Sequence, residues 1–152
     1  IIEEYQIIES KSIGADAILL IAAVLTKPEI VKFTELAHSL KLEVVLEIHD
    51  KEELDKIYEA VNVVGVNNRN LKTLQIDIKT SFQLADLIPS KFLKVSESGI
   101  ESPEVIQKLR EVGYHGFLIG SHFMKHSRPE QACKDLITEL NKTRKELVSH
   151  ED

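Results

Sequence analysis

Five short runs of apolar, mostly β-branched residues recur along this chain, and longer stretches of mixed polarity separate them. The runs are Asp16 to Ile21, Glu43 to Ile48, Val61 to Val66, Phe92 to Val95 and Gly116 to Ile119. Each run is nearly apolar throughout rather than alternating, which is typical of parallel strands that are covered on both faces. The sequence therefore predicts five buried parallel strands.

Amphipathic helices are predicted between these strands, because apolar residues recur there at helical spacing. Their apolar faces comprise Ile30, Phe33, Leu36, Ala37 and Leu40, then Leu54, Ile57 and Tyr58, and later Val105, Ile106, Leu109 and Val112. Pro28 and Pro103 fall at helix starts, the second preceded by Ser102 as a predicted N-cap. Gly14 and Gly113 fall at helix ends, where a left-handed cap is usual. Strict alternation of strand and helix predicts an α/β fold.

Two α/β architectures compete, an open doubly wound sheet and a closed barrel. A doubly wound nucleotide-binding sheet is expected to carry a glycine-rich turn after its first strand, but residues 21–25 contain no glycine. We therefore predict a (β/α)8 (TIM) barrel that is incomplete, with about five parallel strands and their helices. The 152 residues, 43% of them hydrophobic, suffice for one core, so residues 1–152 are predicted to form a single domain.

Charge and composition narrow the classes of partner that we expect for this chain. The net charge is −6 and acids and bases are interspersed, so there is no basic stripe for nucleic acid. The longest apolar run, Ala17 to Leu25, is shorter than the roughly 20 residues that a membrane span needs. The single cysteine, Cys133, has no partner for an internal disulfide. We expect a cytoplasmic protein with no nucleic-acid or membrane partner.

Glu47 is the sharpest polar signal, because it stands between Leu46 and Ile48 near the end of an apolar strand. Alternation points its side chain away from theirs, which in a barrel means toward the lumen. A desolvated carboxyl there is suited to acid or base catalysis, although a structural Glu paired to a cation would look the same. His49 follows two residues later and is read either as a strand-end cap or as a catalytic group.

Other polar groups follow the later strands, and the carboxyl ends of barrel strands carry the active site. The segment Asn67-Asn68-Arg69-Asn70 combines amide and guanidinium groups directly after a buried strand, and Glu97 lies at the equivalent position of the next strand. A turn rich in asparagine would look similar. Taken with Glu47 and Glu97, this segment is predicted to contact a ligand.

Two glycine-serine pairs follow the last two strands, Ser98-Gly99 and Gly120-Ser121. Barrel enzymes often bind phosphate in these two loops, through backbone N–H groups and the start of a short helix, here predicted over Ser121 to Met124. The alternative is a pair of ordinary turns. We predict a phosphate site formed by Ser98, Gly99, Gly120 and Ser121. No metal site is expected, because the histidines, which include His115, His122, His126 and His150, lack ligand spacing.

The ordered series of these segments resembles indole-3-glycerol phosphate synthase. The segments that carry the resemblance are residues 15–22, 46–50, 65–71, 96–100 and 118–121, and the likeness runs from Tyr5 to about Leu136. The family converts 1-(2-carboxyphenylamino)-1-deoxyribulose 5-phosphate to indole-3-glycerol phosphate, with loss of CO2 and water, in tryptophan biosynthesis. It acts as a carbon-carbon lyase without metal or organic cofactor. Phe123 stands where the family more often has leucine.

The resemblance also implies a role for each matching residue. Glu47 would be the general base, Asn67 would orient the substrate, and Glu97 would bond the sugar hydroxyls. Arg69 would hold the loop and the acidic end of the substrate. The phosphate would be bound by Ser98, Gly99, Gly120 and Ser121.

The family's general-acid lysine and a further Glu and Lys pair precede the segment that matches Ile1-Ile2, so we expect them to lie outside these residues. The chain opens without Met, as if cut from something longer. We therefore expect no ring closure by this chain alone, but weak phosphate affinity. Open strand edges predict self-association or pairing with the N-terminal half of a barrel. The alternatives are a half-barrel that only binds phosphorylated metabolites, or another phosphate-binding barrel such as phosphoribosylanthranilate isomerase.

Overall fold

A computed structural model describes the backbone of residues 1–148 and the side chains of residues 1–142. Its single sheet contains β1 (Ala17–Ile21), β2 (Glu43–Ile48), β3 (Val63–Asn67), β4 (Leu93–Glu97) and β5 (Gly116–Leu118). All neighbours are parallel and the strand order follows the chain order, β1-β2-β3-β4-β5. A doubly wound sheet would reverse its order part-way, so this sequential winding is that of a barrel.

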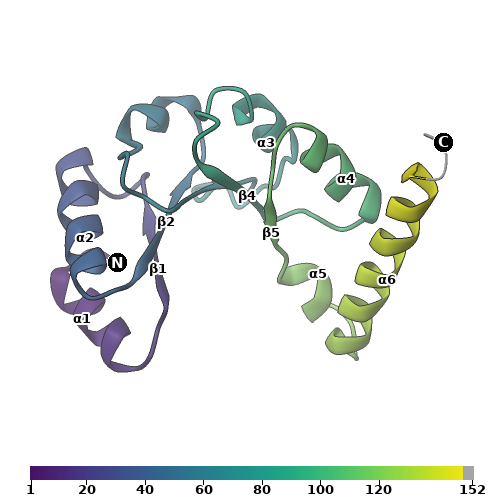
Figure 1. The fold of residues 1–152 in the computed structure, drawn as a ribbon, viewed down its shortest axis with the longest axis horizontal. Coiled ribbons are helices and arrows are strands. Elements are labelled where there is room, and N and C mark those ends of the chain that lie inside the picture. The colour runs from purple at the N-terminus through teal and green to yellow at the C-terminus, as the bar shows by residue number, and fades with distance from the viewer. Residues whose placement is uncertain (149–152) are drawn as a thin grey trace.

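Most of the helices lie along the outer side of the arc that the strands form, whereas the short α5 follows the end of β5 (Figure 1). They are α1 (Glu4–Ser12), α2 (Lys27–Ser39), α3 (Lys79–Leu84), α4 (Pro103–Glu111), α5 (Ser121–Met124) and α6 (Pro129–Val148), with a 3₁₀ helix, η1 (Lys51–Lys56), between β2 and β3. The single-domain prediction extends to residue 152, and residues 149–152 lie outside the described backbone.

The core lies between the outer face of the sheet and these helices. Leu46, Val64 and Val66 are completely buried there, together with Ile30 and Leu109 from the helices. The predicted coverage of both strand faces is wrong for this chain: Leu93 and Leu118, which point to the concave side, are 52% and 54% exposed. Strands that are apolar on both faces are normally covered by other elements on each face, but the described residues cover only the convex face.

Helix ends agree with the local sequence signals. The Ser102 hydroxyl accepts a hydrogen bond from the Val105 N–H at the start of α4. Thr26 and Glu29 form a capping box at the start of α2, with Pro28 in its first turn. Gly14 and Gly113 have φ values of +90° and +89°, the left-handed caps expected of them.

One predicted helix is wrong. Leu54, Ile57 and Tyr58 suggested an amphipathic α-helix, but this segment forms only the short η1, which ends at Ile57 in an extended conformation and is followed by a turn at residues 59–60. Asp50 caps η1 by accepting a hydrogen bond from the Glu53 N–H. At the other end of η1, Lys56 Nζ donates hydrogen bonds to the carbonyls of Ala22 and Leu25. These cross-connections to the β1–α2 loop outweigh the weak helical periodicity.

A buried lysine fixes β4 against its helices. Lys94 is 7% exposed, and its Nζ donates to the Ala85 carbonyl at 2.7 Å, just after α3, and to the Val112 carbonyl at 3.2 Å, at the end of α4. A cation at two helix C-termini satisfies carbonyls that the helices leave open and interacts favourably with both helix dipoles. The opposite end of the same strand carries Glu97.

Candidate active site

The register of the sheet brings the polar strand ends to one edge. Glu47 of β2 is aligned with Ile21 of β1 and with Gly65 of β3. Glu97 of β4 is aligned with Asn67 of β3 and with Leu118 of β5. Side chains on one face of a parallel strand recur every second residue, so Glu47, Asn67 and Glu97 all face the concave side.

Gly65 allows the two carboxyls to meet across the strand between them. A Cβ at this position would overlap Glu97 Oε1, which shows that the Glu97 side chain lies directly over the glycine. From there it reaches toward Glu47 on the other side of β3. Both carboxyls are almost fully buried, with 4% and 6% of Glu47 and Glu97 exposed. Gly65 is a site-forming residue that the sequence analysis missed.

The buried carboxyl pair shares one proton. Burial, followed by the neighbouring Glu47, raises the pKa of Glu97 to about 8. Burial alone would also raise the pKa of Glu47, but its contacts with His49, Glu97 and Asn67 outweigh burial and lower it. Glu47 Oε1 and Glu97 Oε1 have no donor among the described N–H and O–H groups. A proton on Glu97 supplies that donor, so near neutral pH Glu47 is ionised and Glu97 is not.

His49 stands next to this pair. Its Nε2 lies 3.2 Å from Glu47 Oε1 and its Nδ1 lies 3.6 Å from Glu53 Oε2. These are ion-pair contacts without the alignment of a hydrogen bond. Burial would lower the pKa of His49, but the two glutamates more than offset it and raise the pKa to about 9. His49 is therefore an imidazolium near neutral pH.

The stability of the chain is expected to fall as the pH rises from about 5 to about 9. The folded state raises the pKa of Glu97 from 4.5 to about 8 and that of His49 from 6.5 to about 9. A raised pKa stabilises the fold fully below the unfolded value, and this contribution is lost as the pH passes the folded value. The lowered pKa values of Glu47 and Glu53 change the stability with pH only below about pH 4.5, outside this window.

Urea unfolding across this window should show that the free energy of unfolding decreases by an amount on the order of 2–5 kcal/mol as the pH rises. In Glu97→Gln the contribution of Glu97, which is lost between about pH 5 and pH 8, should vanish and leave only that of His49 between about pH 6.5 and pH 9. Glu59→Gln, at an exposed position, should keep both contributions. A flat profile in the unsubstituted chain would contradict the assigned protonation states.

Asn68 connects the strands of the site to α3 through buried hydrogen bonds. It is 2% exposed, and its Nδ2 donates to Ser96 Oγ and to the carbonyls of Glu97 and Ser98. Its Oδ1 accepts from the N–H and the hydroxyl of Ser81 in α3. Buried amides of this kind are costly unless fully bonded, so Asn68 fixes β3, β4 and α3 in one register. No separate role for Asn68 was predictable from its place in the sequence.

A cavity of about 390 Å³ opens beside the carboxyl pair at the last two strand ends. It is lined by Arg69, Glu97, Ser98, Gly120 and Ser121, together with Leu118 and Ile119. The structure thus brings together five of the predicted site residues. Asn67 lines a neighbouring cavity of about 330 Å³, which it shares with His49. Glu97 is the residue common to the carboxyl pair and the larger cavity.

The two glycine-serine loops have the backbone geometry of an anion site. Ser98 and Gly99 both adopt left-handed conformations, with φ of +68° and +72°. Gly120 is the N-cap of α5, which begins at Ser121 as predicted. The N–H groups of Gly99, Gly120 and Ser121 have no acceptor among the described residues. Gly120 and Ser121 line the cavity and Gly99 follows Ser98, which also lines it. The unpaired N–H groups of Gly120 and Ser121 at this cavity are suited to bind an anion.

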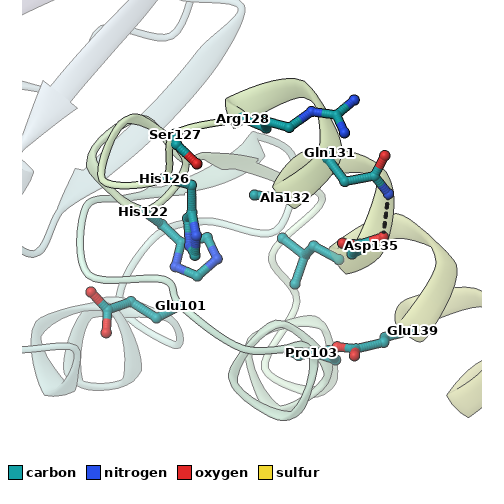
Figure 2. A pocket seen from close by; sticks show the side chains of 11 residues that line it. Glu101, Pro103, His122, His126, Ser127, Arg128, Gln131, Ala132, Asp135 and Glu139 are labelled. Atoms are coloured by element: carbon teal, nitrogen blue, oxygen red, sulfur yellow. Dashed lines mark hydrogen bonds between the residues drawn. The ribbon is translucent and has the colours of Figure 1, made fainter.

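Another cavity, of about 360 Å³, lies between α5 and α6 (Figure 2). His122 and His126 meet there edge to face at 5.4 Å, and Gln131 donates to Asp135. The described residues include no group of three or more His, Cys, Asp or Glu placed to hold a metal ion. His150 lies outside the described residues. This cavity adds nothing to the strand-end site.

Comparison with known proteins decides the family. A family model for indole-3-glycerol phosphate synthase matches residues 1–136. The chain belongs to the indole-3-glycerol phosphate synthase family. It is 47% identical over 137 residues to the indole-3-glycerol phosphate synthase of Bacteroides thetaiotaomicron, covering 90% of this chain and 53% of that protein. It is 42% identical over 147 residues to the Prochlorococcus marinus protein of the same name, covering 92% of this chain and 50% of that protein.

The chain thus spans about half the length of these relatives of the indole-3-glycerol phosphate synthase family. Among solved structures it is similar to 3-hexulose-6-phosphate synthase from Salmonella typhimurium, with a TM-score of 0.76 and 14% identity over 93% of this chain and 70% of that one. It is also similar to a tryptophan synthase α-subunit from Pyrococcus furiosus, with a TM-score of 0.69 and 21% identity over 91% and 60% of the two chains. These likenesses confirm the barrel fold.

The membrane prediction has a structural counterpart. Within the described part of the chain, no helix combines the length and the apolar character needed to cross a membrane.

Proposed function

We propose that this chain supplies the C-terminal half of an indole-3-glycerol phosphate synthase active site. The reaction is the conversion of 1-(2-carboxyphenylamino)-1-deoxyribulose 5-phosphate to indole-3-glycerol phosphate, with loss of CO2 and water. The observation that carries the proposal is the cavity of about 390 Å³, where unpaired N–H groups lie next to the carboxyl of Glu97 and hence to the Glu47 pair.

Each group has a role that its environment supports. Glu47, ionised and desolvated, is the base that takes the proton whose loss completes the new double bond. Glu97 keeps its proton near neutral pH and can therefore donate a hydrogen bond to a sugar hydroxyl as well as accept one. Asn67 orients the substrate from the neighbouring strand, and Arg69 faces its acidic end.

The phosphate end of the substrate is assigned to the glycine-serine loops. Ser98, Gly120 and Ser121 line the cavity, and Gly99 directly follows Ser98 with a left-handed backbone. The proposal assigns the phosphate to the backbone N–H groups and hydroxyls of these four residues. Arg69 adds a positive charge to the lining of the same cavity. The proposal includes no metal or organic cofactor, as the resemblance to the family implies.

The concave face favours a partner that completes the barrel. Leu19, Leu93 and Leu118 are 37%, 52% and 54% exposed on it, and β1 and β5 are free sheet edges. Exposed apolar side chains between open strand edges favour pairing with further strands. The proposed partner is the N-terminal half of a barrel of this family, and self-association is the competing outcome.

Phosphate binding tests the proposed phosphate cradle, formed by Ser98, Gly99, Gly120 and Ser121, without any need for turnover. Inorganic phosphate is expected to shift the amide resonances of Gly99, Gly120 and Ser121 in ¹H–¹⁵N NMR spectra, with a Kd on the order of millimolar. Gly99→Ala should weaken binding about tenfold or more, because Gly99 has φ of +72° and an added Cβ would collide with Ile76.

Gly14→Ala is the matched control. Gly14 also has a positive φ, but an added Cβ there meets nothing within 4 Å, and the residue lies at the far end of α1. It should leave the phosphate Kd unchanged. Saturable shifts confined to other amides, or no saturation at all, would contradict the assignment of the cradle.

A further inference from the structure

We propose that His49 and Glu53 form a positioning pair for Glu47, which holds its carboxylate as the base of the site. The inference rests on the proposed function, because it assigns a task to the carboxyl pair of that site. It concerns two residues that neither the glycine-serine loops nor the substrate contacts involve.

The position of His49 follows from the strand. It lies two residues after Glu47, so the two side chains point to the same face as the chain leaves β2. The result is the 3.2 Å contact between His49 Nε2 and Glu47 Oε1. The His49 side chain is 12% exposed, so water screens the contact little.

Glu53 is fixed more firmly than an ordinary surface glutamate. It is 7% exposed, and its Oε2 accepts the backbone N–H of His49 at 2.7 Å while lying 3.6 Å from the ring Nδ1. Its own N–H donates to Asp50, the cap of η1. The unexpected short η1 is what places Glu53 here, four residues after His49. One carboxylate thereby holds both the backbone and the ring of His49.

The arrangement explains how two equivalent carboxyls acquire different protonation states. An imidazolium next to Glu47 stabilises the ionised form of that residue, and the carboxylate of Glu53 stabilises the imidazolium in turn. Glu97 is affected by His49 more weakly and by Glu47 more strongly, so the proton stays on Glu97. Other charges near the group are Lys56, which acts on Glu53, and Asp50 and Asp77, which line the cavity next to His49.

NMR titration of the complete 152-residue chain tests the pair. The side-chain carboxyl resonances of Glu47 and Glu97 and the ring nitrogens of His49 would be followed from about pH 4 to pH 10 in the unsubstituted chain, in His49→Gln and in Glu53→Gln. In His49→Gln the lower of the two macroscopic pKa values of the carboxyl pair should rise by about one unit or more, a tenfold change in proton affinity.

Glu53→Gln keeps an oxygen that can accept the His49 N–H but removes the charge. It should lower the pKa of His49 and raise that of Glu47 in the same direction as His49→Gln, by a smaller amount. A purely structural cap predicts no movement of either value. Glu52→Gln is the control, because Glu52 lies in the same η1 but is exposed.

If His49→Gln fails to fold, Glu53→Gln decides the outcome. Carboxyl titrations that coincide with those of the unsubstituted chain in a folded Glu53→Gln variant would overturn the inference. The measurement needs neither substrate nor turnover. Failure of phosphate binding or ring closure would therefore count against the proposed function and leave this result standing.

Discussion

Gly65→Ala is expected to separate the Glu47 and Glu97 carboxyls and to lower the pKa of Glu97 from about 8 to nearly that of an ordinary glutamate. The added Cβ would occupy the space of Glu97 Oε1. Because the concave face is open in this chain, Glu97 can swing outward into solvent instead of forcing the sheet apart. The loss of global stability should therefore be modest, about 1–3 kcal/mol.

The chemical consequence is larger than the energetic one. Once Glu97 leaves, Glu47 loses the neighbour that carries the shared proton, and the cavity of about 390 Å³ loses the carboxyl on its inner wall. Carboxyl titration by ¹³C NMR would report the first effect, and urea unfolding would report the cost in stability. We expect the fold to survive and the coupled titration to disappear.

Gly116→Ala is the matched control. Gly116 also lies in a strand, and an added Cβ there would make a tight contact only with Val95 Cγ2, at 3.2 Å. It should leave the pKa of Glu97 near 8. A Gly65→Ala variant with the same coupled titration as the unsubstituted chain would show that the glycine does not create the carboxyl pair.

The strand ends were predictable from sequence because two local rules suffice. Continuous apolar runs mark buried parallel strands, and polar residues at their carboxyl ends must share one edge of the sheet. Glu47, Asn67 and Glu97 were found in this way, and so were the glycine-serine loops. The sequential strand order then excluded a doubly wound sheet.

The contacts between strands were not predictable in the same way. The role of Gly65 depends on the Glu97 side chain, which extends from β4 over Gly65 of β3 toward Glu47. Only the register of the strands reveals this contact. Asn68 differs from Asn67 by facing α3 rather than the site, and its five hydrogen bonds end on residues 13 to 30 positions away. The role of Glu53 depends on η1, where helical periodicity gave the wrong element.

Ring closure is expected to need a second half of the barrel. The resemblance to the family assigns the general-acid lysine to a strand that precedes the segment matched by Ile1-Ile2, and Lys11, Lys27 and Lys51 match neither it nor the family's other lysine. In the proposed function, the 152 residues would provide the base, the sugar contacts and the phosphate cradle of the site. A base without its acid should not close the indole ring at a measurable rate.

The most direct test mixes this chain with the separately purified N-terminal half of the Bacteroides thetaiotaomicron relative and follows formation of indole-3-glycerol phosphate. We predict no product from either half alone and turnover by the mixture. Glu47→Gln in this chain should lower kcat of the mixture by about 10²–10⁴-fold, whereas Glu52→Gln should leave it unchanged. Turnover by this chain alone, no turnover by a mixture in which the halves associate, or full turnover with Glu47→Gln would contradict the account.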